Sequence, residues 1–171
     1  MKKFFYFTAL ILLTCCKSPE KENTVLIMDE SALQATCLSL EALAKNEEIK
    51  EENEDYSKLF KYYNDIIHYA EVINDSSLLA WNLNRYGYAF YRKCDGKKRM
   101  GADEAKVFFD SLSFKKDLNL AIERLEEAEK IENDICDKNL SWRIKTNLKR
   151  LRDIKEKYCK ENEILNKKIE Y

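Results

Sequence analysis

The near absence of proline and glycine is the strongest constraint on the fold. The only proline is Pro19, and the three glycines all fall between Gly87 and Gly101. Proline interrupts helices and glycine weakens them, so a chain this poor in both is suited to long helices. A β-sandwich needs turn residues about every 8–12 positions, and this chain lacks them. We therefore predict an all-α fold.

Apolar residues recur at helical spacing in five segments. Leu33, Cys37, Leu40 and Ala44 step by four, three and four, which is the pattern of one helix face. We predict helices near 29–44, 56–74, 76–93, 115–132 and 138–160. The third helix follows Asp75, a capping residue, and is apolar on most sides, which predicts a central position. Segment 94–101 (CDGKKRMG) predicts a break, residues 103–112 a short amphipathic piece, and residues 161–171 a frayed tail.

The first sixteen residues form a second strong signal. Two lysines precede an uncharged run over 4–14, which is shorter than the roughly 20 residues that a membrane-spanning helix needs. The run ends in Leu13-Thr14-Cys15-Cys16, and this sequence resembles the lipobox of bacterial lipoproteins. A buried first helix is the alternative, but the aromatic and β-branched run at the N-terminus disfavours it.

The lipobox resemblance implies a signal peptide at 1–15, a lipidated cysteine with a polar tether at 16–28, and a helical domain at 29–160. Cys16 is the preferred lipid site, because the residue before it is small; for Cys15 the preceding residue is the β-branched Thr14. Each buried methylene of an acyl chain contributes about 0.8 kcal/mol, so several chains anchor a protein stably. We expect attachment to a membrane of the bacterial cell envelope, and to the outer membrane if the bacterium is Gram-negative.

The predicted helices also resemble tetratricopeptide repeats. The residues that carry this resemblance are Ala121, Leu125, Ala128 and Asn133, then Tyr63, Ile67, Ala70 and Asp75, and the aromatic pair Trp81 and Tyr88. The chain departs from the family pattern at Asn84 and Arg85, where leucine and glycine are usual. The resemblance implies a right-handed stack of antiparallel helix pairs. An irregular helical bundle with the same core spacing is the alternative.

No motif for catalysis, cofactor or metal binding is present. The chain has one histidine, His68, and neither a glycine-rich phosphate loop nor paired metal-ligand spacing. Removing the leader with Lys2 and Lys3 lowers the 30 basic residues to 28, against 31 acidic residues. This balance gives no electrostatic reason to bind nucleic acid. We expect a protein that is not an enzyme and that uses no cofactor.

Four cysteines follow the leader, and an exported protein could pair them. In an antiparallel stack Cys94 and Cys159 end two helices at the same end of the layer, so we predict this disulfide, with four reduced thiols as the alternative. Cys136 begins the helix that Cys159 ends, about 34 Å away at 1.5 Å per residue, so these two cannot pair. Cys37 lies on an apolar stripe and is predicted to be a buried thiol.

Basic and aromatic residues of the third helix and the break after it form the candidate binding surface. Its members are Trp81, Arg85, Tyr88, Arg92, Lys97, Lys98 and Arg99. They suit a helical module that binds a protein or peptide of the envelope, although core aromatics and a solvated loop explain the same residues. A second hypothesis is a small inhibitor or immunity-type lipoprotein that neutralises an envelope-targeting toxin or hydrolase through an inserted loop at 94–114.

Overall fold

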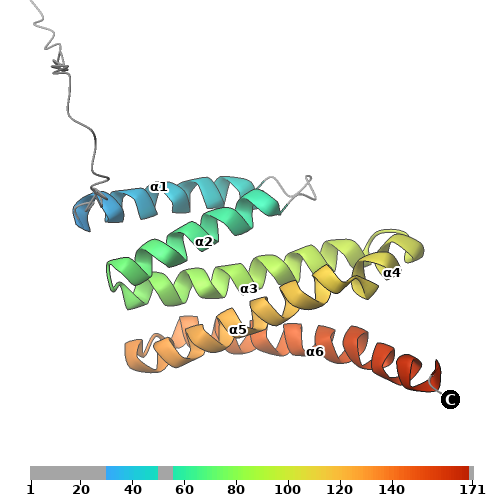
Figure 1. Ribbon diagram of the computed structural model, residues 1–171. Coiled ribbons are helices and arrows are strands. Elements are labelled where there is room, and N and C mark those ends of the chain that lie inside the picture. Colours follow the sequence, from blue (N-terminus) through green and yellow to red (C-terminus); the bar gives the residue numbers. More distant parts are fainter. Residues whose placement is uncertain (1–29, 50–55, 170–171) are drawn as a thin grey trace, which may run out of the picture.

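The computed structural model describes residues 30–49 and 56–169, and the leader, including Cys15 and Cys16, lies outside these ranges (Figure 1). The described residues form helices and no strand, which confirms the all-α prediction. The helices are α1 (Glu30–Ile49), α2 (Ser57–Val72), α3 (Ser76–Lys98), α4 (Ala102–Asp110), α5 (Leu112–Ile135) and α6 (Lys138–Ile169).

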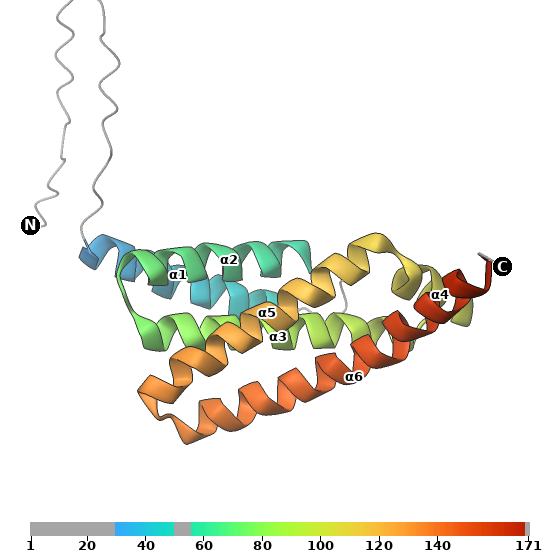
Figure 2. The ribbon, with the colours of Figure 1, turned by 60° about the horizontal axis from the view of Figure 1, so that its bottom comes forward.

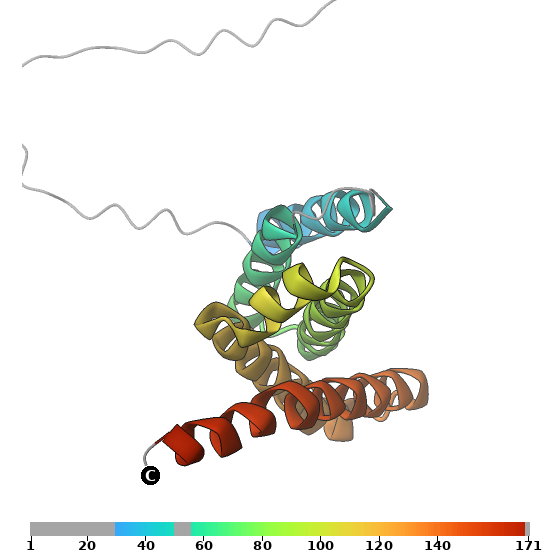
Figure 3. The ribbon, with the colours of Figure 1, turned by 90° about the vertical axis from the view of Figure 1, so that its right-hand side faces the viewer.

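The long helices run back and forth, and each packs against the next. α1 contacts α2, α2 contacts α3, α3 contacts α5, and α5 contacts α6. Figure 2 shows α5 crossing α3 obliquely before α6 returns. In the end-on view of Figure 3, α1 and α3 lie on one side, α2 and α5 on the other, and α6 lies below them. The repeat-like stack itself stays a prediction.

α3 is the central helix, as its apolar circumference predicts. It contacts α2, α4, α5 and α6. The Asp75 side chain caps its first turn by accepting a hydrogen bond from the backbone N–H of Leu78 at 2.9 Å. Cys37 and Ala44 on α1 are buried, as the first apolar stripe predicts.

α3 and α5 pack closely at Gly87. A Cβ built there would lie 2.5 Å from Cγ of Leu125, which is fully buried. Ala121 and Ala128, two of the small residues noted in the sequence, are also fully buried on α5. Small side chains on both helices therefore allow α5 to approach the backbone of α3.

The predicted break at 94–101 is wrong over most of its length. α3 continues to Lys98, so only 99–101 separate it from α4. The physical reason is tertiary packing: Cys94 is fully buried in the core, and Asp95 pairs with Arg99 one turn later at 2.6 Å. A glycine in the last turn, Gly96, costs only about 1 kcal/mol, which these contacts offset.

Two further boundaries differ from the predictions. α5 begins at Leu112, because the Ser111 side chain accepts a hydrogen bond from the backbone N–H of Phe114 at 3.1 Å and caps the helix. No loop therefore spans 94–114, since α3, α4 and α5 occupy most of that segment. α6 continues to Ile169, beyond its predicted end at residue 160.

The four described cysteines are all thiols in the structure. Cys37 and Cys94 are fully buried, which confirms the prediction of a buried thiol at Cys37. Cys94 belongs to the hydrophobic core, and the partly buried Cys159 packs against that core. Burial raises the pKa of the Cys94 thiol to about 12. The Cys94–Cys159 disulfide stays a prediction.

Candidate binding face on α1, α3 and α6

Four of the predicted surface residues share one face of α3. Trp81, Arg85, Tyr88 and Arg92 are spaced by four, three and four, so they lie above one another along the helix. All four are half-buried. These four residues therefore lie on a face of α3 that has α1 on one side and α6 on the other.

On the α1 side, Arg85 forms an ion pair with Glu41. The two side chains meet at 2.6 Å, with 40% of the Arg85 side chain and 24% of the Glu41 side chain exposed. The fully buried Asn82 also bonds to Glu41. Its Nδ2 donates to the Glu41 carboxylate at 3.3 Å and to the Leu78 carbonyl at 2.8 Å. These polar bonds hold α1 against α3.

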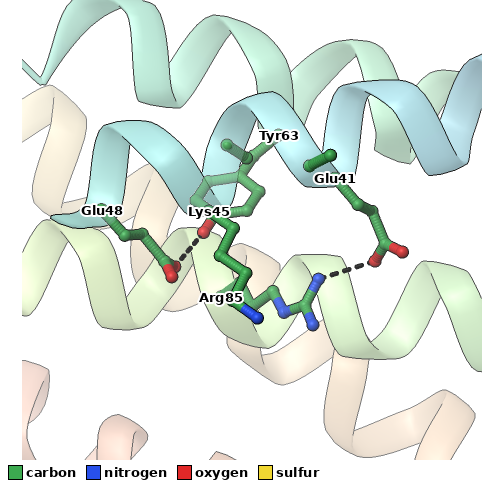
Figure 4. A pocket seen from close by; sticks show the side chains of 7 residues that line it. Glu41, Lys45, Glu48, Tyr63 and Arg85 are labelled. Carbon is green, nitrogen blue, oxygen red and sulfur yellow. Dashed lines mark hydrogen bonds and ion pairs between the residues drawn. The ribbon is translucent and has the colours of Figure 1, made fainter.

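A polar pocket of about 290 Å³ opens beside this ion pair, between α1, α2 and α3. Figure 4 shows Lys45 and Arg85 between the carboxylates of Glu41 and Glu48. The buried Tyr63 hydroxyl donates to Glu48, and burial together with this bond raises the pKa of Tyr63. The two cations balance the two carboxylates, so the pocket has no net charge to favour an ion.

A second hollow, of about 380 Å³, adjoins the first and shares Glu41 and Arg85 with it. Its other lining residues are Asp75, Ser77, Leu78 and Trp81. Trp81 therefore borders both the α1 side and the α6 side of the face.

On the α6 side, arginines lie over the rings of α3. The Arg143 guanidinium carbon is 5.9 Å from the ring centre of Trp81, and that of Arg150 is 4.8 Å from the ring centre of Tyr91. Within α3, Arg92 lies 6.0 Å from the ring centre of Tyr88. We call Trp81, Tyr88, Tyr91, Arg92, Arg143 and Arg150 the arginine–ring row.

The aromatic residues of α3 thus divide into two groups. Tyr86 and Phe90 are buried in the core, whereas Trp81, Tyr88 and Tyr91 are half-buried on the face. The Tyr88 and Tyr91 rings stack with centres 6.3 Å apart. The core interpretation is therefore confirmed for Tyr86 and Phe90, and a binding role for the other three stays a prediction.

A buried amide pair fixes α6 under the row. Asn147 Nδ2 donates to Asn84 Oδ1 at 3.0 Å, and both residues are buried. Arg150 donates to Asn147 Oδ1 at 3.4 Å. Asn84 is one of the departures from the repeat pattern, and its side chain is used to bind the neighbouring helix.

Lys97, Lys98 and Arg99 do not join this face. They lie at the end of α3, with Lys97 about 24 Å along the axis from Trp81. Lys97 and Lys98 point to other sides of the helix, and Arg99, which follows the last residue of α3, is paired with Asp95. Of the predicted surface residues, Trp81, Arg85, Tyr88 and Arg92 therefore share this face of α3, and the other three lie away from it.

Sequence reasoning missed the partners from other helices. Glu41, Lys45, Arg143 and Arg150 were not singled out. A signal existed for the α6 pair, since Arg143 and Arg150 lie seven positions apart beside predicted core residues. Which residues of α1 and α6 contact α3 depends on tertiary packing, and sequence spacing within one helix does not reveal it.

The described parts of the chain contain no group of three or more residues suited to hold a metal ion. In the same ranges, no helix combines the length and the apolar character that crossing a bilayer requires. No protein-family model matches the chain, and neither a curated protein nor a solved structure is significantly similar to it.

Proposed function

We propose that the protein is a lipid-anchored lipoprotein of the bacterial envelope whose helical body binds a segment of another envelope protein or peptide. The observation that carries the binding role is the arginine–ring row, in which half-buried rings of α3 lie beside the exposed Arg143 and Arg150 of α6. Aromatic residues and arginine are enriched at interface centres, where they contribute most of the affinity. The sequence Leu13-Thr14-Cys15-Cys16 supports the anchor.

The face has the stiffness that binding favours. Asn84–Asn147 joins α3 to α6, and Arg85–Glu41 joins α3 to α1. A surface held in place before the partner arrives loses less conformational entropy when it binds. The inhibitor alternative lacks the inserted loop that distinguished it, because α3, α4 and α5 occupy most of 94–114.

Metabolic labelling with palmitate tests the anchor. We expect the wild-type protein and the Cys15→Ala variant to incorporate the label, and the Cys16→Ala variant to lose it. Label retained in Cys16→Ala would move the lipid to Cys15. An unlabelled wild-type protein would refute the anchor.

Site-specific photo-cross-linking in the intact bacterium tests the binding face. A photoreactive phenylalanine analogue replaces Tyr88 in one strain and Lys155, which is exposed on α6, in the control strain. We expect a discrete adduct at position 88, identified by mass spectrometry, and none at position 155. Equal adducts at both positions, or none at 88, would contradict the proposal.

A further inference from the structure

Two arginines of the row, Arg143 and Arg150, differ from most other arginines in the described chain. Arg143 and Arg150 are exposed, and no carboxylate of the described residues forms an ion pair with either. Elsewhere the arginines meet acidic partners, as seen at Arg85, Arg99, Arg124 and Arg152. Arg143 and Arg150 therefore present positive charge that no described carboxylate neutralises.

Each of these two guanidinium groups is oriented by neutral contacts. Arg143 Nε donates to Asn139 Oδ1 at 3.1 Å, and Arg150 donates to Asn147 Oδ1 at 3.4 Å. The rings of Trp81 and Tyr91 lie beneath them. A guanidinium has five N–H donors, so most remain available to a carboxylate, and stacking reduces the entropy lost when that bond forms.

The spacing of the two arginines limits what can bind both. They are seven residues apart on α6, which is about 10.5 Å at 1.5 Å per residue. In a polyproline II segment, side chains three residues apart lie on the same side and about 9 Å apart. Such segments also bind in grooves lined by aromatic rings. In a β-strand, side chains three apart point to opposite sides.

We infer that the arginine–ring row binds an extended peptide segment that carries two carboxylate side chains three residues apart, one on Arg143 and one on Arg150. This inference rests on the proposed function, because it names the chemistry of the partner for the same face. Charge complementarity supports an acidic partner, and the spacing supports an extended one. Arginine pairs with carboxylates in a two-bond geometry that is about twice as strong as a neutral hydrogen bond.

The remaining charges of the face favour a short peptide over a long polyanion. The chain has 31 acidic and 30 basic residues, and Glu41 and Asp75 line the adjoining hollow. These carboxylates interrupt the positive charge beside the row, whereas a nucleic acid or an anionic bilayer binds best to an extended basic surface. A short segment contacts the row alone.

Fluorescence anisotropy with the full chain in non-ionic detergent tests the inference. The probe is a labelled, blocked hexapeptide, Pro-Glu-Pro-Pro-Glu-Pro. One control replaces both glutamates with glutamine, and a second places the two glutamates side by side. We expect the probe to bind most tightly and the glutamine peptide not to bind. We expect Arg143→Gln and Arg150→Gln each to weaken binding about tenfold, and Lys155→Gln to have no effect.

A second readout follows binding from the protein. Trp81 and Trp142 are the only tryptophans, and Trp142 is 66% exposed. In the Trp142→Phe variant the fluorescence of Trp81 reports on the row alone. We expect it to change on adding the glutamate probe and not on adding the glutamine peptide.

Several results would overturn the inference. The inference is wrong if the glutamine peptide or the adjacent-glutamate peptide binds as tightly as the probe. It is also wrong if both arginine variants bind the probe as tightly as the wild-type protein does. Tighter arginine-dependent binding to anionic vesicles or to an oligonucleotide would assign the row to another class of ligand. If the protein self-associates and the arginine variants do not, the row binds a second copy of the chain. A persistent cross-link at position 88 with no peptide binding would refute only this inference, whereas loss of the cross-link would refute the proposed function.

Discussion

The close approach of α5 to α3 makes Gly87 a sensitive position. A Cβ there would lie 2.5, 2.6 and 2.8 Å from the Cγ, Cδ1 and Cδ2 atoms of Leu125, whereas carbon atoms in contact normally stay about 3.5–4.0 Å apart. Leu125 is fully buried, so it cannot move into solvent. Overpacking of this kind costs about 1–3 kcal/mol. Alanine returns up to about 1 kcal/mol through its higher helix propensity. We expect Gly87→Ala to destabilise the fold by about 1–2 kcal/mol.

Gly96 provides a matched control on the same helix. It is exposed, and a Cβ there would meet nothing within 4 Å. Gly96→Ala gains helix propensity without a clash, so we expect it to stabilise the fold by about 0.5–1 kcal/mol. Both variants replace a glycine of α3 with alanine, so the difference between their free energies of unfolding isolates the packing cost at Gly87.

Thermal unfolding of the purified full chain, followed by circular dichroism, measures both variants. In a protein of this size, 1 kcal/mol shifts Tm by about 2–4 °C, so the two variants should move in opposite directions. Leu125→Ala supplies a further check: it should cost about 2–5 kcal/mol alone, and Gly87→Ala should then become stabilising. If Gly87→Ala melts above the wild type, as Gly96→Ala should, the close approach of the helices is wrong.

Three other predictions concern buried polar groups and thiols. Asn147→Leu removes the donor to the buried Asn84 Oδ1 and should cost about 1–3 kcal/mol, measured by urea unfolding. Alkylation at pH 8 should label the exposed Cys136 rapidly and the buried Cys94 only after unfolding; a Cys94 that stays unlabelled in denaturant until a reductant is added would indicate the disulfide to Cys159. Burial raises the Cys94 pKa from its ordinary 9.0 to about 12, so the unfolded chain loses this proton first. Stability should therefore fall as pH rises above 9, and Cys94→Ala should reduce that slope in urea titrations.

Local patterns predict most of the helices because their causes are local. Leu33, Cys37 and Ala44 recur at the helical period, and all three are buried. Asp75 has the side chain that an N-terminal cap needs, and it makes that hydrogen bond. These features require no knowledge of the rest of the fold.

The wrong boundaries arise where tertiary contacts override a local signal. The residues at 94–96 include an aspartate and a glycine, which favour a break, yet Cys94 is fully buried and holds α3 in helical form. The Ser111 cap is a local feature, but it lies next to Leu112, an exposed apolar residue that marks no helix face. Periodicity alone places the start of α5 too late.

The candidate binding face was predictable from the sequence on one helix only. The spacing of Trp81, Arg85, Tyr88 and Arg92 states that they share a face. It does not state that Arg143 will lie over Trp81, because that contact joins residues far apart in sequence.

Asn84 and Arg85 explain how one helix can hold both sides of the face. They are adjacent in sequence, so they point about 100° apart around α3. Asn84 bonds to Asn147 on α6, and Arg85 bonds to Glu41 on α1. Apolar contacts tolerate sliding, whereas a hydrogen bond is made at one register and costs about 1–3 kcal/mol when a buried partner is lost. Asn84 therefore fixes the register of α6 against α3, and with it the positions of Arg143 and Arg150 over their rings, whereas Arg85 fixes the register of α1.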